Sequence, residues 1–396
     1  MTLSKNEKIK ETLKQTKLKR QLQRCRVIEL KINTKRMGKE EFKKLNFLFT
    51  QCKWLYNYLL SLPSEELFKF NTATTKITSL DKDGKTINRE LTLPAQIKQA
   101  VHQELCNNIR TLAQLKKKQH KIGKLKFKSN YDSINLKQYG KTHSIKSNNK
   151  FKIPFLKAFK VFGLKQIKNS FEIANAKLLR KESGYYILLT CYENLTKNSF
   201  KLKTNDCGLD FGIKTHITTS DGEKFNITIG ENEHIKSLRK KLSRQQRGSN
   251  NSKKTIHKIR LAYEKLYNKK KDATNKLVSY LCNKYCAVYM QDEMIKGWHK
   301  RYGRCVQHSI LGKVKEKLKE QKNVYIIEKH YPTTKLCHNC GSMNKNITLK
   351  DRIFVCESCG YTEDRDIKAA KTVLFIGKCK TNYTTTEHSR LSNVEK

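Results

Sequence analysis

The stretch of residues 207–222 constrains the fold of this chain more than any other. Its first strand (Cys-Gly-Leu-Asp-Phe) is apolar except for one acid, Asp210, and a second strand follows at about residues 215–219. Asp221-Gly222 is a hairpin turn signal, after which a third strand is expected at about residues 224–229. A carboxylate at the centre of an apolar strand is costly to bury without a partner. A metal ion is the usual compensation, and an acid that makes a turn at a strand edge is the alternative.

The charge balance indicates a polyanionic partner. The 396 residues include 84 Lys or Arg and only 35 Asp or Glu, and the resulting charge of +49 is spread along the whole chain. A protein this basic repels itself unless it binds a polyanion, so nucleic acid is the leading candidate and an anionic membrane the weaker one. No apolar run of about 18 residues is present, so no membrane-spanning segment is expected. Most of the 13 cysteines are scattered singly, which suits a reducing cytoplasm.

The first half of the chain is expected to combine a sheet with helices. Alternating apolar and polar residues predict a strand at 24–33. Apolar residues at helical spacing predict a helix at 39–61, and Pro94 begins a second helix after a polar, irregular segment at 62–93. A hairpin pattern follows at 174–192. Small antiparallel barrels built in this way often bind nucleic acid, although a fold alone does not establish a function.

A long basic helical region follows the Asp210 strands at about residues 231–282. The sequence Gly248-Ser-Asn-Asn251 interrupts it, so two helices joined by a polar loop are expected. One side has an apolar seam, and the other is so basic that contact with phosphate is favoured over a solvated face. The basic stretch 123–128, with one aromatic residue, suits a base-stacking surface and a solvated strand face equally. The candidate nucleic-acid contacts are Trp54, Tyr56, Asn57, Lys124, Lys126, Lys128, Arg239, Arg244, Arg247, Lys253 and Lys254.

Four cysteines form the most specific local pattern in the sequence. Cys337 and Cys340, and Cys356 and Cys359, are two Cys-x2-Cys pairs separated by fifteen residues, and a glycine directly follows each pair. Four thiolates at this spacing predict a closed, tetrahedral and therefore structural zinc site. A redox pair is the alternative, but it would explain only one of the two motifs.

Three acids stand out along the second half. Asp210 lies on the first strand, Glu293 follows a buried strand that begins at about residue 286, and Asp366 lies on a late helix. Between Glu293 and Asp366, the sequence predicts a further helix, through Val306 and Leu318, and a buried strand at 323–328. This order of a strand meander, two strands and a helix is that of the RNase H-like α/β fold. Clustered carboxylates repel one another, and two Mg²⁺ ions would reverse that repulsion and support phosphodiester hydrolysis.

The chain resembles the TnpB family of insertion-sequence-encoded, RNA-guided nucleases, which are related to compact type V CRISPR effectors. The resemblance covers about residues 24–374, and its anchors are Gln51–Asn57, Leu209–Lys214, Leu242–Ser249, Thr333–Gly341 and Cys359–Asp366. It implies a Mg²⁺-dependent RuvC-like DNA endonuclease with an inserted zinc ribbon. It also implies a noncoding guide RNA, a double-stranded DNA target beside a short flanking motif, and a prokaryotic, nucleoid-associated cytoplasmic location. A separately encoded transposase is a further candidate partner.

The resemblance also implies a division into domains. An oligonucleotide-binding-like β-barrel carries a helical insertion, and the nuclease domain carries the ribbon. The expected boundaries are a basic arm at 1–19, the barrel at 20–38 and 121–203, the helical domain at 39–120, the nuclease domain at 204–335 and 361–376, the ribbon at 336–360 and a disordered tail at 377–396.

Two positions depart from the family pattern. Asp210 and Asp366 match the first and third catalytic acids of the family. The second acid depends on the alignment. Alignment on Ile295-Lys296 puts Gln291 at its position, whereas alignment on the acid itself selects Glu293 over Asp292. Lys368 stands where asparagine is common. These departures support a second hypothesis, a nuclease-weakened RNA-guided DNA-binding protein that represses transcription or assists transposition. A conventional transposase and a zinc-ribbon transcription factor are less favoured, because the transposase of such elements is normally separate and a transcription factor needs no Asp210.

Overall fold

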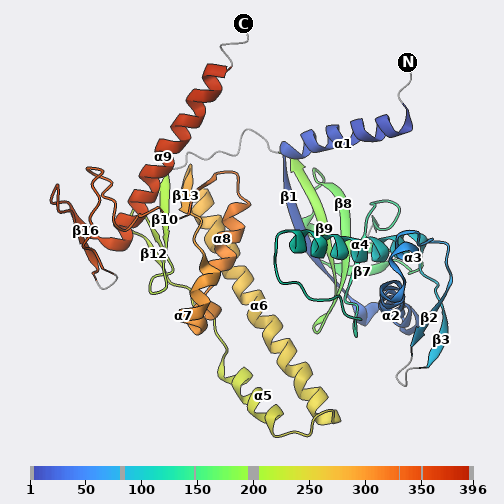
Figure 1. Cartoon of the computed structure of the whole chain (residues 1–396). Coiled ribbons are helices and arrows are strands. Elements are labelled where there is room, and N and C mark those ends of the chain that lie inside the picture. Colours follow the sequence, from blue (N-terminus) through green and yellow to red (C-terminus); the bar gives the residue numbers. More distant parts are fainter. Residues whose placement is uncertain are drawn as a thin grey trace. The chain divides into compact units, whose positions relative to one another are not determined.

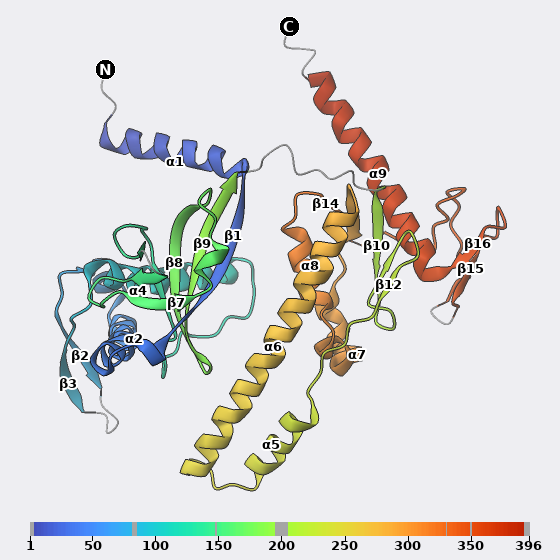
Figure 2. The same cartoon turned by 180° about the vertical axis from the view of Figure 1, so that it is seen from behind.

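The computed structural model describes residues 4–80, 85–146, 149–194, 205–329, 331–348 and 351–391, with side chains up to residue 379. It divides into two compact units, Met1–Lys197 and Asn198–Lys396 (Figures 1 and 2). The expected boundary at residues 203 and 204 lies outside the described residues. None of the described helices is long and apolar enough to cross a membrane.

The first unit is built on a seven-stranded antiparallel sheet with the order β4-β8-β9-β1-β7-β6-β5. The alternating stretch at 24–33 is β1, and the predicted hairpin is β8 and β9, so both predictions are confirmed. The strands are β1 (Gln23–Ile32), β4 (Ser133–Leu136), β5 (Ser144–Lys146), β6 (Lys150–Lys152), β7 (Phe159–Phe162), β8 (Glu172–Lys181) and β9 (Gly184–Asn194). Short 3-10 turns, η1 (Thr34–Arg36) and η2 (Leu164–Gln166), follow β1 and β7.

Helices occupy the chain before β1 and between β1 and β4. The predicted basic arm is a helix, α1 (Lys5–Gln21), which Ser4 and Glu7 begin with a capping box. The predicted helices are present as α2 (Lys39–Ser61) and α4 (Ala95–Lys117), and Pro94 is the residue before the first turn of α4. Apolar side chains of α2 and α4 share one buried core with those of β1 and β9.

The prediction of an irregular segment at residues 62–93 is wrong. It contains a short helix, α3 (Ser64–Phe68), and a hairpin of β2 (Lys76–Leu80) and β3 (Thr86–Glu90). Few residues of this segment are apolar, so hydrophobic periodicity does not reveal its helix and strands. The buried Ile77 and Leu91 attach the segment to the core. The Asp83-Gly84 pair in the sequence is the hairpin signal that could have found it.

The second unit is built on a five-stranded mixed sheet with the order β12-β11-β10-β13-β14. The antiparallel meander is β10 (Cys207–Phe211), β11 (Ile217–Thr219) and β12 (Lys224–Phe225), and β13 (Val288–Gln291) and β14 (Val324–Ile327) add to it in parallel. The strand predicted at 323–328 is present, but it is buried only in part: Ile327 is buried, whereas Tyr325 and Ile326 are exposed because β14 is an edge strand.

Helices cover both faces of this sheet. The helical hairpin of α5 (Glu233–Ser243) and α6 (Asn250–Lys284) is present as expected (Figures 1 and 2). α6, α7 (Ile295–His308) and α8 (Leu311–Lys319) share a core with Leu209 and Met290, whereas α9 (Arg365–Leu391) packs with Tyr289 on the opposite face. The single helix expected through Val306 and Leu318 is two helices, because Ser309 forms a β-bridge with Thr228 instead.

The helix that carries Asp366 is longer than expected. The prediction of a disordered tail from residue 377 is wrong as far as residue 391, because α9 continues to Leu391. Val373 and Ile376 are buried beside Tyr289, so the helix is already formed where the polar segment begins, and each further residue only has to extend it. Residues 392–396 lie outside the described residues.

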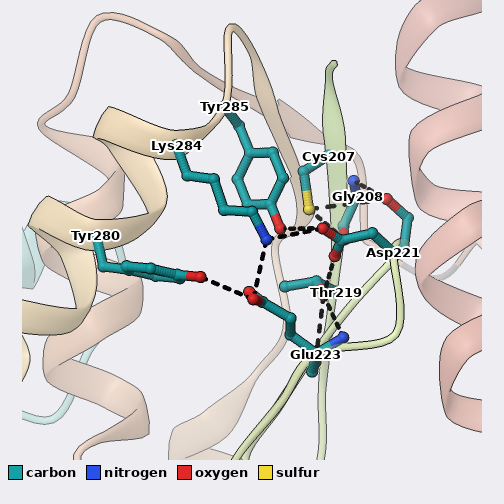
Figure 3. Close-up of polar contacts among 9 residues, drawn as sticks. Cys207, Gly208, Thr219, Asp221, Glu223, Tyr280, Lys284 and Tyr285 are labelled. Carbon is teal, nitrogen blue, oxygen red and sulfur yellow. Dashed lines mark hydrogen bonds and ion pairs between the residues drawn. The ribbon is translucent and has the colours of Figure 1, made fainter. Parts of the chain in front are cut away.

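A polar cluster fixes the β11–β12 turn to the end of α6 (Figure 3). Asp221 accepts hydrogen bonds from the Tyr285 hydroxyl at 2.6 Å and from Lys284 Nζ at 3.0 Å. Burial alone would raise the pKa of Asp221, but hydrogen bonds from neighbouring hydroxyls and Lys284 lower it to about 2. The cluster lies at the Cys207 end of β10, so it anchors the hairpin at the end of the sheet away from Asp210.

Candidate metal centres

The four predicted cysteines come together. Their sulfur atoms all lie within 4.8 Å of one another, with 3.9 Å between Cys337 and Cys359 and 3.6 Å between Cys340 and Cys356. Four sulfurs at 2.3 Å from a tetrahedral zinc ion would be about 3.8 Å apart, so the donor set and its spacing fit zinc. The ribbon also contains an antiparallel pair, β15 (Ile353–Val355) and β16 (Thr362–Asp364), so its strand pairing extends beyond the expected end at residue 360.

Two features of the knuckles favour metal-binding thiolates. The glycines that follow each pair, Gly341 and Gly360, have φ values of 75° and 71°, a backbone conformation that glycine adopts without strain. Ser342, which the sequence reasoning missed, places its hydroxyl 3.0 Å from Cys340 Sγ and 3.2 Å from Cys356 Sγ. The Ser342 hydroxyl is the main cause that lowers the pKa of the Cys356 thiol to about 6.

We expect Cys356→Ser to abolish stoichiometric zinc binding. Loss of one of four ligands opens the site, and because metal binding contributes directly to folding, the melting temperature of the second unit should fall by about 5–10 °C. Elemental analysis and thermal unfolding measure the two effects. Cys305→Ser is the matched control, since Cys305 is exposed on α7 outside the cluster. Full zinc content in the Cys356 variant would contradict the assignment.

Asp210 lies on the central strand and faces α9. Two residues before Asp210, at Gly208, α9 packs directly on the backbone of β10. A Cβ atom added to Gly208 would lie 2.0 Å from the Ala370 carbonyl oxygen. Because alternate residues of a strand share a face, Asp210 points to the same side. Burial, and then the negative charges of Asp366 and Glu293, raise the pKa of Asp210 to about 8. The three predicted acids are therefore electrostatic neighbours.

Asp366 is positioned by the first turn of α9. The Asp364 carboxylate accepts hydrogen bonds from the backbone N–H groups of Asp366 and Ile367, at 3.0 and 3.2 Å, and thus caps the helix. Arg365 lies 3.6 Å from the Asp366 carboxylate. The sequence reasoning missed the capping role of Asp364, which the Asp-Arg-Asp spacing at the start of a helix could have indicated.

The loop after β13 separates the roles of two adjacent acids. Asp292 accepts from Lys315 at 2.7 Å and from Lys319 at 2.8 Å, and these hydrogen bonds lower its pKa to about 2. Lys315 also donates to the backbone carbonyl of Glu293. The Asp292 carboxylate is thus held by lysines, whereas Glu293 contributes to the environment of Asp210, which favours Glu293 as the acid of this loop.

Gln291 occupies the strand position beside Asp210. Leu209 pairs with Met290 in the parallel register of β10 and β13, and continuing that register by one residue puts Gln291 next to Asp210. Its side chain is buried, and Nε2 donates to the Tyr331 carbonyl at 3.1 Å. A neutral amide therefore stands at the strand position nearest to the central acid.

The three acids do not form a closed ligand shell. Within the part of the chain that the structure describes, only the cysteine cluster brings three or more such ligand atoms within 4.8 Å of one another. The all-oxygen donor set of Asp210, Glu293 and Asp366 nonetheless suits Mg²⁺, and like charges without a cation are expected to keep apart.

Lys368 is used inside the protein, between α9 and the ribbon. It is fully buried, and its Nζ donates to the carbonyl oxygens of Thr333 and Thr334, each at 3.0 Å. The ammonium also lies 3.8 Å from the ring centroid of Phe354, in the ribbon core. Burial lowers the pKa of Lys368 to about 8. The side chain therefore joins α9 to the ribbon and to the segment that leads into it.

The candidate nucleic-acid contacts of the first unit need correction. Tyr56 is 2 % exposed and belongs to the core, so no base can stack on it. Asn57 exchanges two hydrogen bonds with the backbone of Lys128, whose Nζ pairs with Glu104 at 2.8 Å. Because these groups are used internally, Asn57 and Lys128 have a structural role that their sequence positions do not reveal. Trp54 is half-buried, with the Arg89 guanidinium 4.2 Å from its ring.

The other basic candidates lie on the surface. Lys124 and Lys126 are exposed beside Phe127, which is 62 % exposed, and their stretch forms no strand, so the alternative of a solvated strand face does not apply. In the helical hairpin, Arg239 is exposed and pairs with Glu231 at 3.1 Å. The other predicted contacts in the hairpin are exposed as well: Arg244, Arg247, Lys253 and Lys254.

Comparisons with known proteins agree with this arrangement. Residues 190–297, which contain β10 and the basic hairpin, match the OrfB_IS605 model, described as "Probable transposase". Residues 308–373, which contain the cysteine cluster, match the model "Cas12f1-like, TNB domain". The chain is 26% identical over 204 residues to "TnpB-like protein L79" of Acanthamoeba polyphaga mimivirus, covering 46% of this chain and 39% of that protein. These matches support placing the chain in the TnpB family.

Other relatives are similarly distant. It is 25% identical over 205 residues to a "Putative RNA-guided DNA endonuclease" of Streptomyces pristinaespiralis, covering 49% of this chain and 50% of that protein. The chain thus matches half or less of the length of these curated relatives.

Solved structures with low overall similarity include a Cas12f1–sgRNA–target DNA complex, at 15% identity and a TM-score of 0.25 over 88% of this chain and 98% of that one. The mini-RNA-guided endonuclease CRISPR-Cas_phi3 matches at 9% identity and a TM-score of 0.43 over 89% and 92%. TM-scores this low support no conclusion about the fold.

Proposed function

We propose that this TnpB-family chain is an RNA-guided DNA endonuclease of a transposable element. The observation that carries the proposal is Asp210 on the central strand, with the carboxylates of Asp366 and Glu293 near enough to raise its pKa. The sheet order, with an antiparallel meander extended by two parallel strands, supports an RNase H-like, RuvC-type nuclease domain. The relative described as an RNA-guided DNA endonuclease supports the same activity.

The proposed domains follow the expected boundaries, with the corrections made above. The seven-stranded sheet is the candidate for the oligonucleotide-binding-like barrel, and α2 to α4 form its helical insertion. The second unit holds the nuclease domain, with the zinc ribbon inserted between β14 and α9. The proposed partners are a noncoding guide RNA, double-stranded target DNA and a separately encoded transposase.

In the proposed mechanism, Asp210, Glu293 and Asp366 are the residues that would hold Mg²⁺. Bound Mg²⁺ would activate water and stabilise the leaving oxygen of a phosphodiester. The exposed cations of the α5–α6 hairpin bind the phosphate backbone of the RNA. Pairing between guide and target opens the duplex and supplies sequence specificity beside a short flanking motif, and the ribbon directs the freed strand to the acids.

A plasmid cleavage assay tests the proposal. The chain is co-expressed with the DNA that flanks its gene, so that a native guide is supplied, and the complex is incubated with a plasmid carrying the matching site beside randomised bases. We expect cuts that require both the guide and Mg²⁺ and that EDTA abolishes. Linear product without the guide would contradict guided cleavage.

The second candidate function is a nuclease-weakened, RNA-guided DNA-binding protein that represses transcription or assists transposition. The buried amide of Gln291 beside the strand position of Asp210 favours it, because an amide is a poorer Mg²⁺ ligand than a carboxylate. Tight guide-dependent binding to the same plasmid without any cut would select this function over the endonuclease.

A further inference from the structure

The segment of residues 331–334 leads from β14 into the first cysteine knuckle and is held from two sides. On the sheet side, Gln291 Nε2 donates to the Tyr331 carbonyl at 3.1 Å, and the Thr333 hydroxyl lies 3.5 Å from Gln291 Oε1. A longer contact of 3.5 Å joins the same nitrogen to the Glu328 carbonyl. The end of β13, next to Asp210, is therefore tied to this segment.

On the helix side, two residues of α9 donate hydrogen bonds to three carbonyl groups along the entry to the ribbon. Lys368 Nζ donates to the carbonyls of Thr333 and Thr334, and the Thr372 hydroxyl donates to the Leu336 carbonyl at 3.4 Å. Lys368 and Thr372 are both fully buried. Cys337, the first zinc ligand, comes directly after Leu336.

The chemistry of these contacts requires donors at both positions. A carboxylate at position 291 would place negative charge against the Tyr331 carbonyl without a proton to share, and leaving a buried acceptor without its donor is costly. A buried ammonium is tolerated only when it is paired, and Lys368 has two carbonyl acceptors and the Phe354 ring. The two departures from the family pattern thus meet on one segment.

We propose that Gln291 and Lys368 are positioning residues that clamp residues 331–334 between β13 and α9. Because of this clamp, the zinc ribbon responds to metal binding as one unit with β10, which carries Asp210, and α9, which carries Asp366. Its role in cleavage rests on the proposed function, whereas the coupling of the ribbon to α9 does not.

The rate of zinc release from the full chain to a chromogenic chelator tests the clamp without nucleic acid. Groups beyond the ligands typically change metal affinity 10- to 100-fold, so we expect Lys368→Met and Gln291→Glu to speed release about 10-fold or more. Thr372→Val is the milder variant if either fails to fold, and it should speed release by about 2- to 3-fold. Lys371→Met is the matched control, since Lys371 contacts Glu363 of the ribbon from the same helix but not residues 331–334.

A second readout separates positioning from a general loss of stability. In zinc-loaded protein, the rise in melting temperature on adding Mg²⁺ reports binding at the acids. We expect Lys368→Met and Gln291→Glu to reduce that rise by at least half, and Lys371→Met to leave it unchanged.

Two results would overturn the clamp. One is zinc release at the wild-type rate in the Gln291, Lys368 and Thr372 variants. The other is faster guided cleavage by Gln291→Glu than by wild type, which would make position 291 a metal-ligand position instead. If wild type does not cleave but the variants release zinc faster, the clamp stands and the proposed endonuclease function fails.

Discussion

Asp210→Asn is expected to reduce guided cleavage by at least about 10³-fold while leaving guide and target binding intact, because it removes the central carboxylate of the proposed metal site. Asn has nearly the same shape, so β10 and the packing of α9 should persist. Cleavage of a matched plasmid and binding of the same target, measured on one preparation, separate the two effects. Asp206→Asn is the control, since Asp206 pairs with Lys378 at 3.4 Å outside the proposed site.

The same variant should be more stable than wild type when metal is removed. The pKa of Asp210 is raised to about 8 in the folded protein, so the folded chain keeps a proton that the unfolded chain releases near its ordinary value of 3.8. Stability of the wild type therefore falls as pH rises from about 4 to about 8, and the penalty is complete above that range. In EDTA at pH 9, Asp210→Asn should gain about 2–5 kcal/mol in the free energy of unfolding, and little at pH 4.

Denaturant unfolding at the two pH values measures this difference. Equal stability of wild type and variant at pH 9 would show that Asp210 ionises freely, and the acids would then not act as a repelling group. Cleavage at the wild-type rate by Asp210→Asn would remove the residue from the catalytic set.

Gly208→Ala is expected to displace α9 from the sheet. The added Cβ would lie 2.0 Å from the Ala370 carbonyl oxygen and 2.7 Å from the Leu374 backbone nitrogen, and neither can move without the helix. Overpacking of this kind costs about 1–3 kcal/mol or more, so a loss of at least about 3 kcal/mol is expected here. Cleavage should also be lost, because Asp366 moves with the helix. Thermal unfolding and the plasmid assay measure the two effects.

Gly312→Ala provides the matched control for this overpacking. Gly312 lies in α8, and nothing is within 4 Å of the position that its Cβ would occupy. Alanine in a helix is favoured over glycine by about 1 kcal/mol, so the control should be as stable as wild type or slightly more stable. Equal destabilisation by the two variants would show that α9 is not seated on Gly208.

Much of the framework could be predicted from local sequence patterns. Period-two alternation located β1 and the β8–β9 hairpin, and helical spacing located α2 and α4. The two Cys-x2-Cys pairs, Cys337 with Cys340 and Cys356 with Cys359, identified the thiolate cluster. The number of ligands and their spacing in the sequence are enough to define such a site. These features depend on residues that are near one another in the chain.

What the sequence could not reveal depends on distant partners. Gln291 and Lys368 read as defects of a catalytic motif until their acceptors in residues 331–334 are known. Tyr56 has an aromatic ring of the kind that stacks on bases, but the ring lies in the core. Asp292 and Glu293 are adjacent and chemically alike, and only the lysines of α8 distinguish them.

In the seven-stranded sheet, the strand that is first in the chain, β1, pairs with the strand that is last in the chain, β9, and this has a consequence for folding during translation. Lys31 of β1 pairs with Tyr186 of β9, which is made 155 residues later. At about 5–20 residues per second, β1 waits roughly 8 to 30 seconds on the ribosome for that neighbour. The helical insertion, whose contacts are more local, has time to form first. The nascent chain therefore exposes an unpaired strand for most of the synthesis of its first unit, and slower translation would lengthen its exposure to aggregation.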